Sequence, residues 1–219
     1  AQTRVHDVTT SEASMTLRYA PGESFVNSKQ RRVPVSLDAP VFTLTHAMGF
    51  KGVLGGEYNF NRTEASIWKR FWLPASWGKI DCSVKAGAEW NTVPFPLLIL
   101  PEANLSYITQ RETFCLINNM EFLNDRFASM SISYDMNGKL FNRIPLLKNL
   151  KWREMFRVRA LWGTLTDKNN PFKSSNPDLF RFPTRDGKFT SFVMDPKVPY
   201  VEASVGIYNI FKLLHVEYV

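Results

Sequence analysis

The stretch that decides the fold is residues 126–166, which read RFASMSISYDMNGKLFNRIPLLKNLKWREMFRVRALWGTLT. Apolar and polar residues alternate with a period of two over residues 127–136, and the alternation returns over residues 156–163. Successive side chains of a β-strand point to opposite faces, so both segments are predicted to be strands with one apolar and one polar face. Between them, residues 142–154 combine leucines at helical spacing with basic residues. We expect a short interfacial turn there, capped by Asn142.

The length of these two strands favours a membrane. Strands of soluble sheets typically have about five or six residues, whereas about nine to eleven tilted residues span a bilayer. The mean hydropathy of −0.21 argues against a helical membrane protein. It agrees with a β-barrel, because half of each barrel strand faces water. Aromatic residues make up 14% of the chain, and many lie near predicted strand ends, where aromatic girdles lie in barrels.

The same alternation predicts further strands. They cover residues 11–19, 59–72, 79–91, 113–123, 200–207 and 214–219, and one more begins at Phe42 and is broken by the glycines from Gly49 onward. With the two strands above, about nine strands are expected. Residues 94–101, PFPLLILP, are predicted to be a connection across a barrel mouth or on the membrane surface, because proline cannot donate to a sheet ladder. Asn124 and Asp125 are expected to form a tight turn.

Together these elements predict an all-β fold, an antiparallel transmembrane β-barrel of which residues 1–219 form part of one domain. Long external loops are expected at about residues 20–40 and 167–198, because long loops of such barrels point outward from the cell. Single-chain bacterial barrels have an even number of strands, and an unclosed sheet exposes backbone groups to lipid. We therefore expect further strands in a longer chain or in a partner. The sequence shows no signal peptide, which an outer-membrane protein needs, so the chain is expected to be a mature or an excised piece.

No pattern in the sequence points to catalysis, a metal or a cofactor. The chain has no glycine-rich phosphate loop, nucleophile elbow or convincing carboxylate pair, so we expect no enzymatic activity. Cys82 and Cys115 are expected to be free thiols, and His6, His46 and His215 lack the spacing of a metal site. An esterase or protease site among the long loops is the enzymatic alternative, with the candidates Asp178, Arg181, Arg185 and Asp186.

Charged residues on the polar strand faces are the candidates for a binding site. In a barrel they would face the lumen, and they are Lys79, Lys85, Glu89, Asp135, Arg157, Arg159 and Glu202. Because they carry both signs, mutual pairing is the first expectation and an ion or solute path is the alternative. The net charge of +7 is dispersed and accompanies no recognition motif, so no nucleic-acid partner is expected.

Four segments together resemble a known family. They are PFPLLILPEANLSY at 94–107, MEFLNDRFASM at 120–130, NRIPLLKNLKWRE at 142–154 and PYVEASVGIYNIFKLLHVEYV at 199–219. In this order they are similar to the C-terminal barrel of a family of Gram-negative outer-membrane proteins of unknown function, whose members often carry a carboxypeptidase-regulatory-like domain upstream. The resemblance implies an outer-membrane β-barrel and supplies no catalytic or ligand-binding residues. The chain departs from the family at residues 102–104, where a glycine usually precedes the asparagine, and it lacks the upstream domain and the final aromatic-terminated strand.

The leading hypothesis is therefore a protein of the cell outer membrane with a structural, transport or assembly-partner role, no chemistry of its own and no cofactor. Its expected partners are the lipid bilayer and lipopolysaccharide, with other outer-membrane proteins or lipoproteins as further candidates. The alternative is a soluble β-sandwich or a lipocalin-like ligand-binding module. The two hypotheses differ at Ala86, Ala88, Met130 and Ile132, which contact lipid in a barrel and pack on side chains in a sandwich.

Overall fold

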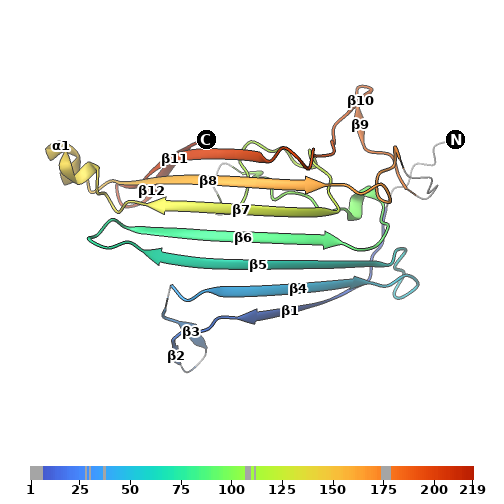
Figure 1. Cartoon of the computed structure of the whole chain (residues 1–219), viewed down its shortest axis with the longest axis horizontal. Coiled ribbons are helices and arrows are strands. Elements are labelled where there is room, and N and C mark those ends of the chain that lie inside the picture. Colours follow the sequence, from blue (N-terminus) through green and yellow to red (C-terminus); the bar gives the residue numbers. More distant parts are fainter. Residues whose placement is uncertain are drawn as a thin grey trace.

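The computed structural model describes residues 7–27, 29, 31–36, 38–106, 110, 112–173 and 179–219. One large sheet organises them, in which each strand pairs antiparallel with its neighbour along the chain (Figure 1). Its strands, in spatial order, are β1 (Glu12–Tyr19), β4 (Val41–Gly49), β5 (Phe60–Trp72), β6 (Lys79–Glu89), β7 (Arg126–Asp135), β8 (Arg153–Thr164), β11 (Tyr200–Ile210) and β12 (Leu214–Tyr218). The predicted all-β fold is confirmed, and the sheet is open, with β1 and β12 as its edges.

Smaller elements lie in the connections. They are the hairpin of β2 (Phe25–Asn27) and β3 (Arg32–Pro34), the hairpin of β9 (Thr184–Arg185) and β10 (Lys188–Phe189), the 3-10 helices η1 (Phe95–Leu97) and η2 (Phe141–Arg143), and the helix α1 (Pro145–Leu150). Among the described residues, no helix is both long and apolar enough to span a lipid bilayer.

The stretch that decides the fold forms β7 and β8, with a register that runs from Arg126 opposite Thr164 to Asp135 opposite Met155. The basic turn between them contains α1, as expected, but Asn142 does not cap it. Ile144 precedes the helix without a side-chain cap, and Pro145 begins it. Proline suits this first position because its missing N–H has no partner in the helix.

The predicted strand at residues 113–123 is wrong. Within this range only isolated bridges occur, at Phe114 and Phe122, so the main sheet has eight strands and not about nine. Phe114, Ile117 and Leu123 of this segment are buried in clusters with other connections and with β8 instead of alternating between two faces of a sheet. The predicted turn at Asn124 and Asp125 is also wrong, because both residues are fully buried and bonded to neighbouring segments.

The wrongly predicted strand at residues 113–123 also led to a wrong prediction of the side on which a loop lies. With eight strands, residues 20–40 connect β1 to β4 at one end of the sheet, whereas residues 167–198 lie between β8 and β11 at the other end (Figure 1). The two long loops therefore cannot both be external if the sheet crosses a membrane. The α1 turn lies at the end that holds residues 20–40.

The PFPLLILP segment is a connection, as expected, but it is packed in the protein and does not lie on its surface. Val93, Leu98 and Ile99 are buried, and η1 packs on a cluster of apolar side chains where β5 begins and β8 ends. This cluster consists of Phe60, Val93, Leu98, Leu123, Leu165 and Phe182. A second cluster contains Phe114, Ile117, Leu161 and Met194. The core thus lies between the sheet and its own connections.

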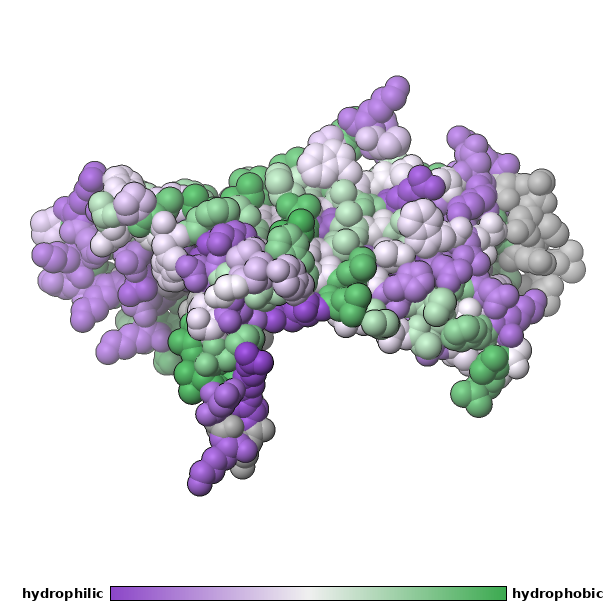
Figure 2. All heavy atoms as spheres, turned by 60° about the horizontal axis from the view of Figure 1, so that its bottom comes forward, coloured by the Kyte–Doolittle hydropathy of each residue, from purple (hydrophilic) through white to green (hydrophobic). Residues whose placement is uncertain are grey.

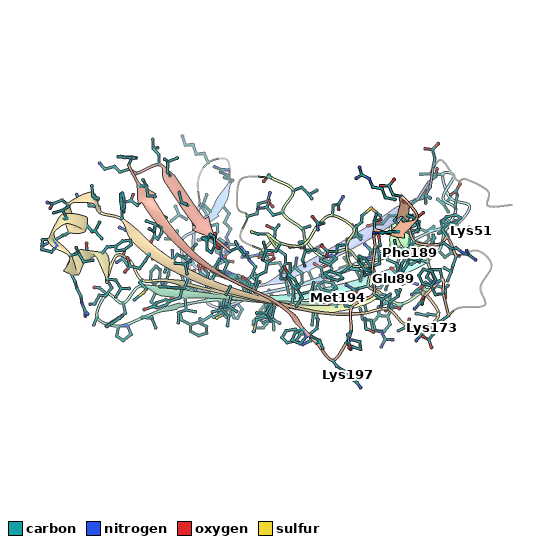
Figure 3. All side chains as sticks on the ribbon, turned by 90° about the horizontal axis from the view of Figure 1, so that it is seen from above. Lys51, Glu89, Lys173, Phe189, Met194 and Lys197 are labelled. Carbon is teal, nitrogen blue, oxygen red and sulfur yellow. The ribbon has the colours of Figure 1, made fainter. Side chains whose placement is uncertain are left out.

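The register gives the sheet two faces of different character. We call apolar face the side that carries Val84 of β6, with Ile67 and Met130 as its neighbours on β5 and β7. The other side, the polar face, carries Lys85, Glu64 and Ser129, and the connection between β6 and β7 folds over it. In Figure 3 the strands β11 and β12 bend away from the plane of β6 toward that connection.

Candidate functional site

The polar face is the candidate site, because it gathers the charged residues that the sequence singled out. All seven lie on it, on four adjacent strands: Lys79, Lys85 and Glu89 on β6, Asp135 on β7, Arg157 and Arg159 on β8, and Glu202 on β11. Period-two alternation places them there, since the register aligns the polar positions of neighbouring strands.

Each of the three β6 residues has a charged partner. Lys79 lies 3.6 Å from Asp135, and Glu89 lies 3.6 Å from Arg62. Lys85 is held by three carboxylates, with Glu102 at 2.5 Å and Glu64 and Glu112 each at 3.7 Å. Two of these three carboxylates come from the connection over the polar face, so the lysine ties this connection to the sheet.

The deepest part of the network surrounds Glu202. Its carboxylate accepts the backbone N–H groups of Cys115 and Leu116 at 3.0 and 2.7 Å and the Tyr200 hydroxyl at 2.8 Å. Arg159 lies 3.4 Å away, and the side chains of both members of this ion pair are almost fully buried. A buried carboxylate needs such partners, because leaving a charge unpaired away from water is costly.

A second buried ion pair lies beside the first. Arg157 donates to Glu217 of β12 at 3.0 Å, and Glu217 also accepts a hydrogen bond from Ser204. His215 approaches the same carboxylate to 3.6 Å. Three groups from three strands thus meet at Glu217, which links the edge strand β12 to the interior of the polar face.

A hollow of about 310 Å³ opens on the polar face beside these pairs. Hydroxyl groups, aromatic rings and charged groups share its lining. The lining residues are Trp68, Lys79, Asp81, Ser83, Glu112, Ser131, Ser133, Asp135, Met155, Arg157, Tyr208 and His215. Asp135 accepts a hydrogen bond from Tyr208 at 2.6 Å, and Asp81 is held by Arg70 through two hydrogen bonds. The charged side chains around the hollow are therefore already engaged with one another.

Comparison with known families identifies the chain. Residues 2–172 match the model of the C-terminal domain of DUF5686, a family of unknown function. The chain belongs to this family. No curated protein and no solved structure matches it. The matched part of the DUF5686 domain runs from before β1 to beyond β8 and so contains six of the eight strands of the main sheet.

Several members of the network in this DUF5686 domain were missed as candidates. Glu217 could have been found from the sequence, because Leu214, Val216 and Tyr218 alternate with His215 and Glu217 as in the other strands. Glu102 and Glu112 carried no such signal. They lie in an irregular connection, and only the way this connection folds brings them to Lys85.

The other residues considered for chemistry remain apart. Arg181, Arg185 and Asp186 are exposed in the loop that carries β9 and β10, and Asp178 and His6 lie outside the described residues. Cys82 and Cys115 are both free thiols. Among the residues whose positions are described, no three His, Cys, Asp or Glu side chains come together as metal ligands do.

Proposed function

We propose that this DUF5686 domain is part of a transmembrane β-barrel of the cell outer membrane, with a structural, transport or assembly-partner role and no chemistry of its own. One observation carries the proposal, the large and uncovered apolar face. Eighteen large apolar side chains on it are exposed: Met15, Leu17, Tyr19, Phe42, Leu44, Met48, Ile67, Phe71, Val84, Ile132, Phe156, Val158, Trp162, Val201, Val205, Leu214, Val216 and Tyr218.

An apolar face of this extent is unfavourable in water. Monomeric soluble proteins rarely expose contiguous apolar patches larger than a few hundred Å², and here the apolar residues run in register across all eight strands. The charged residues of the face, Lys69, Arg126 and Glu154, lie near strand ends. Figure 2 shows apolar residues gathered over the middle of the molecule and hydrophilic ones at the α1 end and on the β2–β3 hairpin. An apolar region next to a polar end suits a lipid bilayer and its boundary with water.

Strand length and aromatic placement support the same proposal. The five strands β5, β6, β7, β8 and β11 have between 10 and 13 residues. At about 3.3 Å per residue and a tilt near 45°, this length matches an apolar band about 25 Å tall. Trp90 follows β6, and Trp152 precedes β8. Tryptophan prefers the boundary between lipid and water.

The soluble alternatives fit less well. A β-sandwich needs a second sheet on the apolar face, yet within the described ranges the other sheets are hairpins with strands of two or three residues. A lipocalin-like module would share the up-and-down order of eight strands, but it encloses an apolar cavity. Here the face that curves around the connection is polar, and the apolar side chains point away from it.

The paired charges of the polar face fit a structural wall better than an ion path. Each of the seven charged residues has an opposite charge within 4.0 Å, so these side chains neutralise one another. Lipid and lipopolysaccharide are the partners that this proposal requires, and other outer-membrane proteins or lipoproteins are candidates for an assembly role.

The test is fractionation of the full-length parent protein, followed by gel mobility with and without boiling. We expect the protein to appear with outer-membrane markers, to need detergent for extraction and to change its mobility on boiling, as folded barrels do. A protein that stays in the soluble fraction and is monomeric without detergent would overturn the proposal.

A further inference from the structure

The net positive charge of the chain is concentrated at one end of the sheet. The connections at the α1 end, residues 20–40, 73–78, 136–152 and 211–213, contain eight basic and two acidic residues. The connections at the opposite end, residues 50–59, 90–125 and 165–199, contain eight basic and nine acidic residues. The first end therefore has a net charge of +6, compared with +7 for the whole chain.

Within that end, two neighbouring turns combine exposed basic and exposed apolar residues. We call them the basic rim, which consists of residues 136–152 and 211–213. Asn209 joins them by donating a hydrogen bond to the Lys151 carbonyl oxygen at 2.7 Å. In the rim Leu146 is 82% exposed and Leu213 88% exposed. Side chains of this size at a turn tip are costly in water, and the interfacial zone of a bilayer accommodates them.

The rim contains cations and no acidic residue of its own. Residues 136–152 contain four basic residues and no Asp or Glu. No described acidic residue forms an ion pair with Arg143, Lys148, Lys151 or Lys212, and all four are exposed. The polar face differs, because all of its predicted candidates are paired.

The acidic residues of this end do not compensate for the rim. Glu23 and Asp38 both lie in residues 20–40, which join the strands at the opposite edge of the sheet. Glu23 is engaged by Arg18 at 2.7 Å, and this hydrogen bond lowers the pKa of the Glu23 carboxyl group. The positive charge of the rim is thus left for an external partner.

We propose that the basic rim binds the anionic headgroups of phospholipids in the membrane leaflet at this end. The inference rests on the proposed barrel. Lys and Arg beside an anionic membrane surface are attracted to it, and exposed leucines insert at the headgroup boundary. The long connections at the opposite end mark that end as external. The rim therefore faces the leaflet on the side of the shorter connections, where phosphate groups belong to phospholipids and not to lipopolysaccharide.

The test compares two variants that carry the same change of charge. The rim variant combines Lys148→Gln, Lys151→Gln and Lys212→Gln. The control variant combines Lys51→Gln, Lys173→Gln and Lys197→Gln, three lysines that lie away from α1 in the other half of the molecule (Figure 3). Each full-length protein is purified in detergent and titrated with dioleoylphosphatidylglycerol or dioleoylphosphatidylcholine, and native mass spectrometry measures the bound lipid.

We expect the wild type and the control variant to prefer phosphatidylglycerol, and the preference to weaken in high salt. Each lysine near an anionic surface contributes a factor of about five, so the rim variant should lose at least about tenfold of this preference. Equal losses in both variants, or no preference in the wild type, would overturn the inference. So would tighter binding of lipid A than of phosphatidylglycerol at the rim.

Gel mobility with and without boiling is measured first on every sample. A wild type whose mobility does not change on boiling would overturn the barrel proposal and this inference together. A normal change of mobility, with the same lipid preference in the rim variant as in the wild type, would overturn only this inference.

Discussion

Val84 offers the sharpest test of what the apolar face contacts. It is the middle residue of β6, it pairs with Ile67 and Met130, and its side chain is 46% exposed. If the face were in water, Val84→Arg would change the free energy of unfolding by no more than about 0.5 kcal/mol, as surface substitutions do. At the middle of a bilayer, the same substitution costs about 2–4 kcal/mol, because a guanidinium group loses its hydration there.

Ile80 supplies the matched control. It lies on the same strand and the same face as Val84, one residue from the strand end, between Phe71 and Tyr134. Arginine near the bilayer interface costs only about 0–1 kcal/mol. In lipid, Val84→Arg should therefore be about 2–3 kcal/mol worse than Ile80→Arg, whereas in water the two variants should be equivalent.

The measurement is urea unfolding of the full-length protein in phosphatidylcholine vesicles. Tryptophan fluorescence and gel mobility without boiling should report the same transition. Equal and small effects of the two substitutions, each below about 0.5 kcal/mol, would refute the assignment of this face to lipid. A large cost at Ile80 with a small cost at Val84 would be equally damaging, because it reverses the expected dependence on depth.

Three further variants test the packing of the connections, each by unfolding as above. Asp125→Ala should cost about 2–4 kcal/mol, because this buried carboxylate accepts hydrogen bonds from Thr166 and Asn169; a change below about 0.5 kcal/mol would show that these groups find other partners. Glu202→Leu should cost about 3–5 kcal/mol by removing the nearer of the two carboxylates beside the buried Arg159, and the double variant with Arg159→Met should recover part of that cost; an additive loss would contradict the pairing. Gly87→Ala places a Cβ atom 2.4 Å from the Phe127 ring, so it should cost about 1–3 kcal/mol, and less in a Phe127→Ala background than in the wild type.

Strands could be predicted from the sequence where one face of the strand is apolar and the other is polar. β5, β6 and β7 begin and end within two residues of the predicted bounds, because their alternation follows from the pleat of the sheet. β8 begins at Arg153, three residues before the predicted start at 156, and ends at Thr164, one residue after the predicted end. The same pattern misled at residues 113–123. There the apolar residues are buried on several sides by irregular packing, and period two arises without a ladder of hydrogen bonds.

That single error propagated to the ends of the sheet. In an antiparallel sheet each strand reverses the direction of the chain, so one additional strand between β6 and β7 moves every later connection to the other side. Residues 20–40 and 167–198 were therefore expected on one side, and the structure places them on opposite sides. A prediction of the fold class remains correct when one strand is miscounted, but the predicted side of each later connection becomes wrong.

In the candidate site, too, the regular strands could be predicted from the sequence and the irregular connections could not. Glu202 and Arg159 could be placed on one face from alternation, and their opposite charges predicted pairing. The reason for their burial could not be predicted, since it depends on Cys115 and Leu116, whose backbone N–H groups reach Glu202 across more than 80 residues of sequence. Long-range contacts made by irregular backbone leave no periodic trace in a sequence.

The two faces of the sheet together explain why a membrane is the most economical account. The chain covers its polar face itself, by folding residues 98–106 and 112–123 over it and by fixing them with Lys85 and Glu202. The described residues offer no comparable cover for the apolar face, where Val84, Ile132 and Val158 remain exposed in the middle of their strands. A soluble protein would do the reverse, because water satisfies polar groups and burial favours apolar ones. This asymmetry between the two faces supports the proposal that lipid covers the apolar face, because a continuous apolar band of this height matches a bilayer.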